Sequence, residues 1–238
     1  MMTCKMAHWA TSTASTTHSR RAFFGEVLAG AAAVATAGQT LSSTVSAQTG
    51  LSPDAAVQQL IDGNARFAEG RITSFEEDLS ILKAKTSEKQ EPFAAVLSCA
   101  DSRVPVELIF DQSIGHLFVT RVAGNIATSP MIASPEYGAA VLGTKAIMVL
   151  GHANCGAVKA SIEAKSVPGQ ISALYPYIRP AVELAGPNLE PTIKANAKMQ
   201  AALLRQSSPV LAEHIKQNQL KIVAAYYDLA SGRVTVLD

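Results

Sequence analysis

The chain has 238 residues, of which 48% are hydrophobic and 16% charged, and its formal net charge is +1. This composition predicts a packed globular protein, and the length suffices for one substantial domain. The near-neutral charge argues against nucleic acid or an anionic membrane as the main binding partner. No apolar run reaches the roughly 18 residues that a spanning helix needs, so we expect no membrane span.

The N-terminal part of the chain differs in composition from the rest. Residues 19–24 read Ser-Arg-Arg-Ala-Phe-Phe, a weakly apolar stretch covers 27–37, and residues 45–47 read Val-Ser-Ala. This pattern resembles a twin-arginine export signal that is cleaved after this last triplet. We therefore expect residues 1–47 to be a signal peptide, residues 48–238 to form the working domain, and the mature protein to be periplasmic. A disordered basic tail or an organelle transit peptide is the alternative.

A first helix is predicted directly after this segment. Residues 52–54 read Ser-Pro-Asp, which supplies an N-cap, a proline in the first turn and an acid near the positive end of the helix dipole. Apolar residues follow at helical spacing as far as Phe67, and Gly70 ends the helix. Residues 71–91 are polar and irregular, which predicts a mixture of helix and loop.

Four short apolar runs then predict buried strands. They cover residues 94–98, 116–120, 146–150 and 221–226. Each run is nearly continuous, and helical or irregular segments separate the runs, which is typical of a parallel sheet covered on both faces. A turn at 231–233 and a fifth run at 234–237 predict an antiparallel edge strand. Together with helices expected over 156–164 and from 209 onward, this predicts an α/β fold with a parallel central sheet flanked by helices.

Two short motifs carry the candidate chemistry. Residues 98–103 read Ser-Cys-Ala-Asp-Ser-Arg, and residues 151–156 read Gly-His-Ala-Asn-Cys-Gly. Cys99 follows the first predicted strand, and His152 and Cys155 follow the third, where ligands of open α/β sheets bind. Two thiolates and one imidazole are a ligand set that Zn²⁺ favours, and an open fourth position is typical of catalytic zinc.

The sequence leaves open whether Asp101 binds the metal or pairs with Arg103. Asp101 and Arg103 alternate with Cys99, so in an extended strand all three side chains point the same way. Asp101 then either binds the metal or pairs with the Arg103 guanidinium. His152 and Cys155 are three residues apart, which places them on one face of the helix expected there.

Other interpretations use the same residues. After signal cleavage Cys99 and Cys155 are the remaining cysteines, so in an oxidising compartment they could form a disulfide. The Asp101–Arg103 pair could be a surface ion pair of little energetic weight. A non-catalytic zinc protein or redox sensor would be marked by a fourth Cys or His near the site, or by loss of the Asp–Arg pair. His116 is expected to be exposed or structural.

The two motifs together resemble the β-class carbonic anhydrases. The likeness extends through residues 118–121, Asn125, residues 136–137 and residues 227–232, and it covers most of residues 52–238. The resemblance implies reversible hydration of carbon dioxide to bicarbonate by a zinc-bound hydroxide. It also implies a homodimer or homotetramer.

The resemblance further assigns roles around the metal. Zinc is implied to be held by Cys99, His152 and Cys155. In a closed form Asp101 is the fourth ligand, and in an open form Asp101 pairs with Arg103 and accepts a hydrogen bond from the hydroxide. Val96 stands where the bicarbonate-locked members carry tryptophan, which favours the open form. Three residues match those that line the family's substrate cleft: Gln90, Phe118 and Tyr137. The same ligands would also serve hydrolysis of CS₂ or COS.

Overall fold

The computed structural model describes residues 50–74 and 89–237. They belong to the unit Val45–Asp238. The predicted signal peptide, residues 1–47, lies outside the described residues, and so does most of the polar segment 71–91. Within the described ranges, no helix is both long enough and apolar enough to cross a membrane.

The centre of the fold is a five-stranded sheet in the order β2-β1-β3-β4-β5. The strands are β1 (Ala94–Ser98), β2 (Leu117–Arg121), β3 (Ala146–His152), β4 (Lys221–Tyr227) and β5 (Val234–Val236). The first four run parallel, and β5 pairs antiparallel with β4 at the edge. The predicted fold class is therefore confirmed, with β2 beginning one residue later than expected and β3 extending two residues further.

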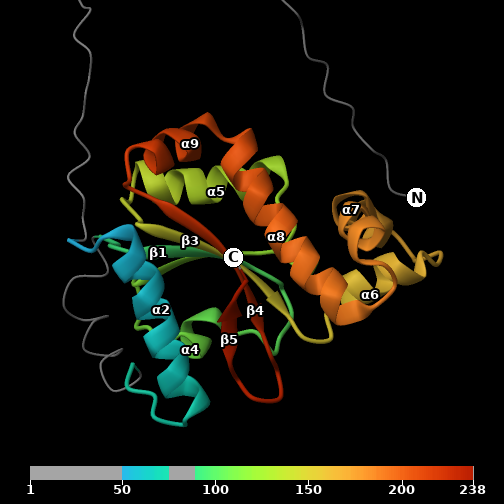
Figure 1. Ribbon diagram of the computed structural model, residues 1–238, viewed down its shortest axis with the longest axis horizontal. Helices are drawn as coiled ribbons and strands as arrows, with labels where there is room; N and C mark the ends of the chain where they lie inside the picture. The colour runs from blue at the N-terminus through green and yellow to red at the C-terminus, as the bar shows by residue number, and fades with distance from the viewer. Residues whose placement is uncertain (1–49, 75–88, 238) are drawn as a thin grey trace, which may run out of the picture. The chain divides into compact units, whose positions relative to one another are not determined.

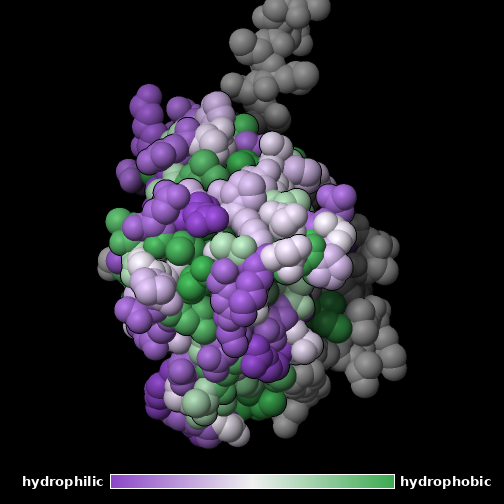
Figure 2. All heavy atoms as spheres, turned by 90° about the vertical axis from the view of Figure 1, so that its right-hand side faces the viewer, coloured by the Kyte–Doolittle hydropathy of each residue, from purple (hydrophilic) through white to green (hydrophobic). Residues whose placement is uncertain are grey.

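Helices cover both faces of this sheet (Figure 1). The helices are α2 (Pro53–Ala68), α4 (Val106–Ile109), α5 (Ser129–Ala140), α6 (Gly156–Glu163), α7 (Tyr175–Ala185), α8 (Leu189–Ser207) and α9 (Pro209–Lys216), with 3-10 turns η1 (Ala123–Asn125) and η2 (Ile171–Leu174). As predicted, Ser52 caps α2, its Oγ accepting a hydrogen bond from the Ala55 N–H at 3.2 Å. Figure 2 shows the side formed by α6 and α7, where hydrophilic and apolar side chains are interspersed.

Alternate strand residues pack against opposite layers. Val96 and Met148 belong to the core cluster beneath α2 and α4. Leu97, Ile147 and Val149 belong to the cluster beneath α5, α8 and α9. Because β1 and β3 are buried along their whole length on both faces, nearly all of their positions are apolar, which is why their sequences are continuous apolar runs.

A buried ion pair fastens the end of α4 to α2. The Asp111 carboxylate is fully buried and accepts hydrogen bonds from Arg66 Nε at 2.5 Å, from Thr73 N at 2.8 Å and from Ser74 N at 2.9 Å. Burial alone would raise the pKa of Asp111, but the guanidinium and the two backbone N–H groups outweigh it and lower the pKa to about 2. Asp111 therefore stabilises the folded state in its charged form.

Candidate metal centre

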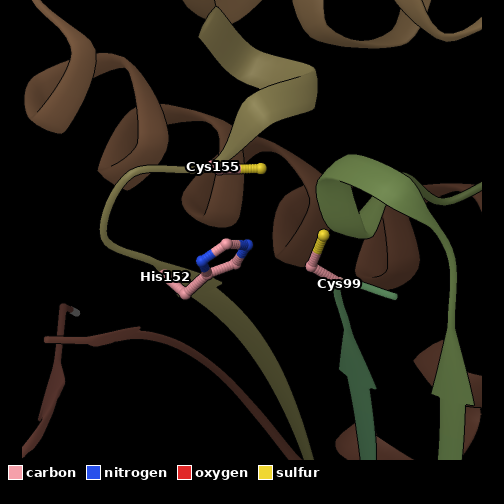
Figure 3. Close-up of side chains that lie close together, drawn as sticks. All are labelled: Cys99, His152 and Cys155. Carbon is pink, nitrogen blue, oxygen red and sulfur yellow. The ribbon is translucent and has the colours of Figure 1, made fainter. Parts of the chain in front are cut away.

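Three predicted ligands meet at the carboxyl end of the sheet. Cys99 directly follows β1, His152 is the last residue of β3, and Cys155 precedes α6. Their ligand atoms all lie within 4.8 Å of one another, and the side chains point toward a common centre (Figure 3). The convergence arises because β1 and β3 are parallel neighbours, with Ser98 opposite Leu150, so that both strands end at the same edge.

The His152 ring is oriented for metal binding. Its Nδ1 lies 2.9 Å from the Ala153 carbonyl oxygen, which can only accept, so Nδ1 carries the proton. The Nε2 atom is fully buried and has no hydrogen-bond partner among residues 50–74 and 89–237. A buried ring nitrogen with a free lone pair beside two sulfurs fits a metal ion. Nitrogen and sulfur donors in this number are typical of zinc.

The local geometry differs from the sequence expectation in two places. His152 and Cys155 are not on one helical face, because β3 continues through His152 and a left-handed residue, Asn154 with φ +54°, turns the chain before α6. The chain is also not extended after Cys99. It turns from Asp101 to Val104, where the Val104 N–H donates to the Asp101 carbonyl at 3.1 Å and Asp101 Oδ1 accepts a hydrogen bond from the Arg103 N–H at 2.9 Å. Aspartate side chains favour such turns because they bond the backbone two residues on.

Asp101 borders the centre but is held by Arg103. The guanidinium donates from Nε to Oδ1 at 2.9 Å and from Nη2 to Oδ2 at 2.8 Å. Asp101 Oδ2 also lies 3.8 Å from His152 Nε2. The hydrogen bonds from Arg103 hold the pKa of the Asp101 carboxyl far below its ordinary range, so the group is a carboxylate at neutral pH. In this arrangement Asp101 faces the cluster without belonging to it.

The two cysteines form no disulfide, and both are buried. The hydrogen bond from the Cys155 thiol, above all, and the Gly124 N–H at 3.3 Å lower the pKa of Cys99, and together they outweigh burial, which raises it. The pKa of Cys155 is raised, first by this shared proton and then by burial. The pair therefore favours the thiolate form of Cys99, and a metal ion would take the place of the proton between the sulfurs.

Two residues at the site were not assigned a role from the sequence. Arg121, at the end of β2, donates from Nε to the Cys99 carbonyl at 3.0 Å and from Nη2 to the Asp101 carbonyl at 2.6 Å. Gly124, in η1, supplies the N–H that reaches the Cys99 sulfur. Gly124 has φ +76°, and a Cβ there would lie 2.8 Å from Ile178 Cδ1, so both conformation and space favour glycine. Arg121 falls within residues 118–121 of the resemblance, whereas the sequence signal for Gly124 was its position just after the second predicted strand.

The three residues expected at a substrate cleft lie elsewhere in the chain. Gln90 is exposed ahead of β1. Phe118 and Tyr137 contact one another, with ring centroids 6.0 Å apart. Phe118 pairs with Ala95, four positions before Cys99, which is a separation of about 13 Å along the strand from that ligand. Tyr137 is 47% exposed. These side chains are therefore not part of the ligand cluster within one chain.

Comparison with known proteins decides the family. A sequence model described as carbonic anhydrase matches residues 94–234. Carbonic anhydrase 2 of Mycobacterium tuberculosis is 34% identical over 200 residues, covering 78% of this chain and 93% of the relative. The solved structure of the β-carbonic anhydrase CcaA is 27% identical with a TM-score of 0.61, covering 76% of this chain and 86% of that one. The chain belongs to the β-carbonic anhydrase family.

Further comparisons agree with this assignment. A carbonic anhydrase of Pseudomonas aeruginosa is 32% identical, covering 76% of this chain and 88% of that protein. A tetrameric β-carbonic anhydrase from Sordaria macrospora shares the fold, with a TM-score of 0.62 at 21% identity, over 68% of this chain and 89% of that one. The region matched by the carbonic anhydrase family model includes β1 to β4 and all three candidate ligands and ends at the first residue of β5, whereas Gln90 and α2 precede it.

Proposed function

We propose that the chain is a zinc enzyme that catalyses the reversible hydration of carbon dioxide to bicarbonate. One observation carries the proposal: a buried Cys99–His152–Cys155 cluster bordered by the carboxylate of Asp101, with an imidazole nitrogen that has no hydrogen-bond partner in the described part of the chain. Three ligands leave a fourth position free, which is the catalytic arrangement of zinc. Bound there, zinc supplies a Lewis acid that lowers the pKa of a water molecule to provide a nucleophile at neutral pH, as in carbonic anhydrase, the standard example of this effect.

Asp101 and Arg103 would govern that fourth position. An unrestrained carboxylate so close to the cluster is itself a good zinc ligand. The two hydrogen bonds from Arg103 hold both carboxylate oxygens, which supports a role for Arg103 in keeping Asp101 off the metal. Asp101 then remains as a hydrogen-bond acceptor beside the cluster and can orient the attacking water. In this proposal Arg103 acts only through Asp101.

We further propose that Gln90, Phe118 and Tyr137 bind substrate in an assembly of this chain, a homodimer or homotetramer. Within one chain Phe118 and the ligands belong to different core clusters. Tyr137 and Val141 are large apolar residues left 47% and 49% exposed near the end of α5, a surface suited to a second copy. The tetrameric neighbour from Sordaria macrospora supports an assembly of this kind.

The proposed reaction is tested on purified protein lacking residues 1–47. We expect one zinc per chain by elemental analysis and rapid CO₂ hydration by stopped flow. Cys99→Ser and Cys155→Ser should lose metal and activity together, because a hydroxyl is a poor zinc ligand at neutral pH. Full zinc content with no CO₂ hydration, or activity on COS or CS₂ alone, would reject the proposed reaction.

The proposed assembly has its own test. Sedimentation should give a dimer or tetramer. Inactive Cys99→Ser chains mixed with weakened Gln90→Ala chains should regain activity, because a mixed pair contains one site with intact ligands and an intact partner residue. A monomer, or a mixture whose activity is only the sum of its components, would contradict the shared cleft.

A further inference from the structure

Two buried amide side chains on α8 meet the loop that follows β2. Asn196 is fully buried, and Gln200 is nearly so. Asn196 Nδ2 donates to the Gly124 carbonyl at 2.9 Å. Gln200 Oε1 accepts from the Ala127 N–H at 2.8 Å, and its Nε2 donates to Asn196 Oδ1 at 3.1 Å and to the Tyr177 carbonyl at 3.0 Å. The two amides therefore tie α7, α8 and the loop together.

This network lies where apolar packing would otherwise be expected. The neighbouring inward positions of α8 are Ile193, Ala197, Ala201 and Leu204, all buried. Burying an amide is costly unless its donors and acceptors are satisfied. Here each amide nitrogen donates and each amide oxygen accepts. A satisfied network of this kind fixes the groups that it contacts, because breaking one hydrogen bond leaves a buried polar group without a partner.

The contacted loop has a backbone that needs support. Gly124 has φ +76° and Asn125 has φ +44°, so two consecutive residues are left-handed. Consecutive left-handed residues are unfavourable and persist only where surrounding contacts hold them. Asn196 holds the Gly124 carbonyl, and Gln200 holds the Ala127 N–H three residues further on. The amides thus clamp the loop on both sides of Asn125.

The clamped loop reaches the metal centre through Gly124. The Gly124 carbonyl accepts a hydrogen bond from Asn196, and the Gly124 N–H donates to the Cys99 sulfur at 3.3 Å. Hydrogen bonds to a metal-bound thiolate draw charge from the sulfur, and partners beyond the ligands typically change metal affinity about ten- to a hundredfold. The position of this N–H therefore depends on the α8 amides.

We infer that Asn196 and Gln200 are positioning residues for the metal centre: they hold the Gly124 N–H on the Cys99 sulfur and so set how much charge that sulfur gives the metal. This inference rests on the proposed function in that it takes the cluster to be the zinc site. Neither amide contacts a ligand directly, and each acts through the loop.

The test compares Asn196→Leu and Gln200→Met with Thr192→Val in the protein lacking residues 1–47. Thr192 is the matched control: it is fully buried on the same helix, and its Oγ1 donates to the Gly186 and Asn188 carbonyls, away from the loop. Two properties are measured besides CO₂ hydration. They are the thiolate-to-metal absorption band of the Co²⁺-loaded protein and the zinc affinity from chelator competition.

We expect Asn196→Leu to shift the absorption band and weaken zinc binding about ten- to a hundredfold. Gln200→Met should change both properties in the same direction but less, because the Asn196–Gly124 bond survives. Thr192→Val should lose stability while its band stays in place and its affinity stays within about twofold of wild type. An unshifted band and unchanged affinity in both amide variants, or equal changes in Thr192→Val, would overturn the inference. If Asn196→Leu does not fold, Gln200→Met decides the question. Metal binding without CO₂ hydration in the wild type would reject the proposed reaction alone, since the band still reports on the loop.

Discussion

Adding one methyl group at Gly124 tests how strictly the loop beside the metal centre is shaped. Gly124 has φ +76°, and a Cβ there would lie 2.8 Å from Ile178 Cδ1 and 3.3 Å from Ala157 Cβ. The left-handed conformation costs a non-glycine residue about 1 to 2 kcal/mol. Displacing the fully buried Ile178 side chain from its rotamer costs about 1 kcal/mol more. We therefore expect Gly124→Ala to lower the free energy of unfolding by about 2 to 3 kcal/mol.

The assay is urea unfolding of the zinc-loaded and the metal-free protein, together with chelator competition for zinc. Two other glycines separate the contributions. Gly70 has φ +68° with open space at its Cβ, so Gly70→Ala should cost about 1 to 2 kcal/mol and leave zinc affinity unchanged. Gly156 follows Cys155 in α6 without a positive φ and also has open space, so Gly156→Ala should cost nothing.

In Gly124→Ala the N–H moves off the Cys99 sulfur, so zinc affinity should fall about ten- to a hundredfold. The reasoning fails if Gly124→Ala is no less stable than Gly70→Ala, because the contact with Ile178 would then cost nothing. It also fails if zinc affinity is unchanged while stability falls, because the loop would then be irrelevant to the metal.

Three further predictions concern charged groups. Arg103→Ala should keep its zinc but lose most activity, and an X-ray absorption spectrum or crystal structure should show an Asp101 oxygen bound to the metal. Asp101→Asn should be slow with water still bound. Near-normal activity in Arg103→Ala would contradict the proposal that Arg103 keeps Asp101 off the metal. Asp111→Asn should lower the free energy of unfolding at pH 7 by about 2 kcal/mol. This loss of stability should shrink as the pH falls from about 5 to 2, because a carboxyl with a depressed pKa stabilises the fold only while it is ionised. A loss that does not depend on pH in urea titrations would argue against the charged pair. We also propose export by the twin-arginine route, so replacing Arg20 and Arg21 with lysine should abolish the periplasmic, shortened form seen on immunoblots, and unchanged export rules that route out.

The sequence alone predicted those features that depend on residues close together in the chain, namely the strands and the two ligand motifs. Apolar runs located β1 to β4 to within one or two residues, because few polar positions interrupt strands that are largely buried. Two short motifs located Cys99, His152 and Cys155, since parallel strands that end at the same edge bring their following residues together.

The sequence was insufficient wherever a contact joins distant parts of the chain. Asn196 bonds a carbonyl 72 positions away, and Arg121 bonds one 22 positions away. Nothing in a single sequence distinguishes these side chains from other polar residues on a helix or at a strand end. The expected helical face for His152 and Cys155 was wrong for a related reason: the length of β3 is set by its pairing with β4 as far as Tyr227.

The origin of the ligands gives the metal a second role, as a cross-link. Cys99 belongs to one strand–helix unit and His152 to another, 53 positions further along the chain. An ion bound to both holds two distant strand ends together, and a preformed site of this kind rarely exists in the unfolded chain. The free energy of metal binding is then also free energy of folding. Removing the metal with a chelator would thus destabilise the fold locally, loosening the carboxyl ends of β1 and β3 while their amino ends stay packed.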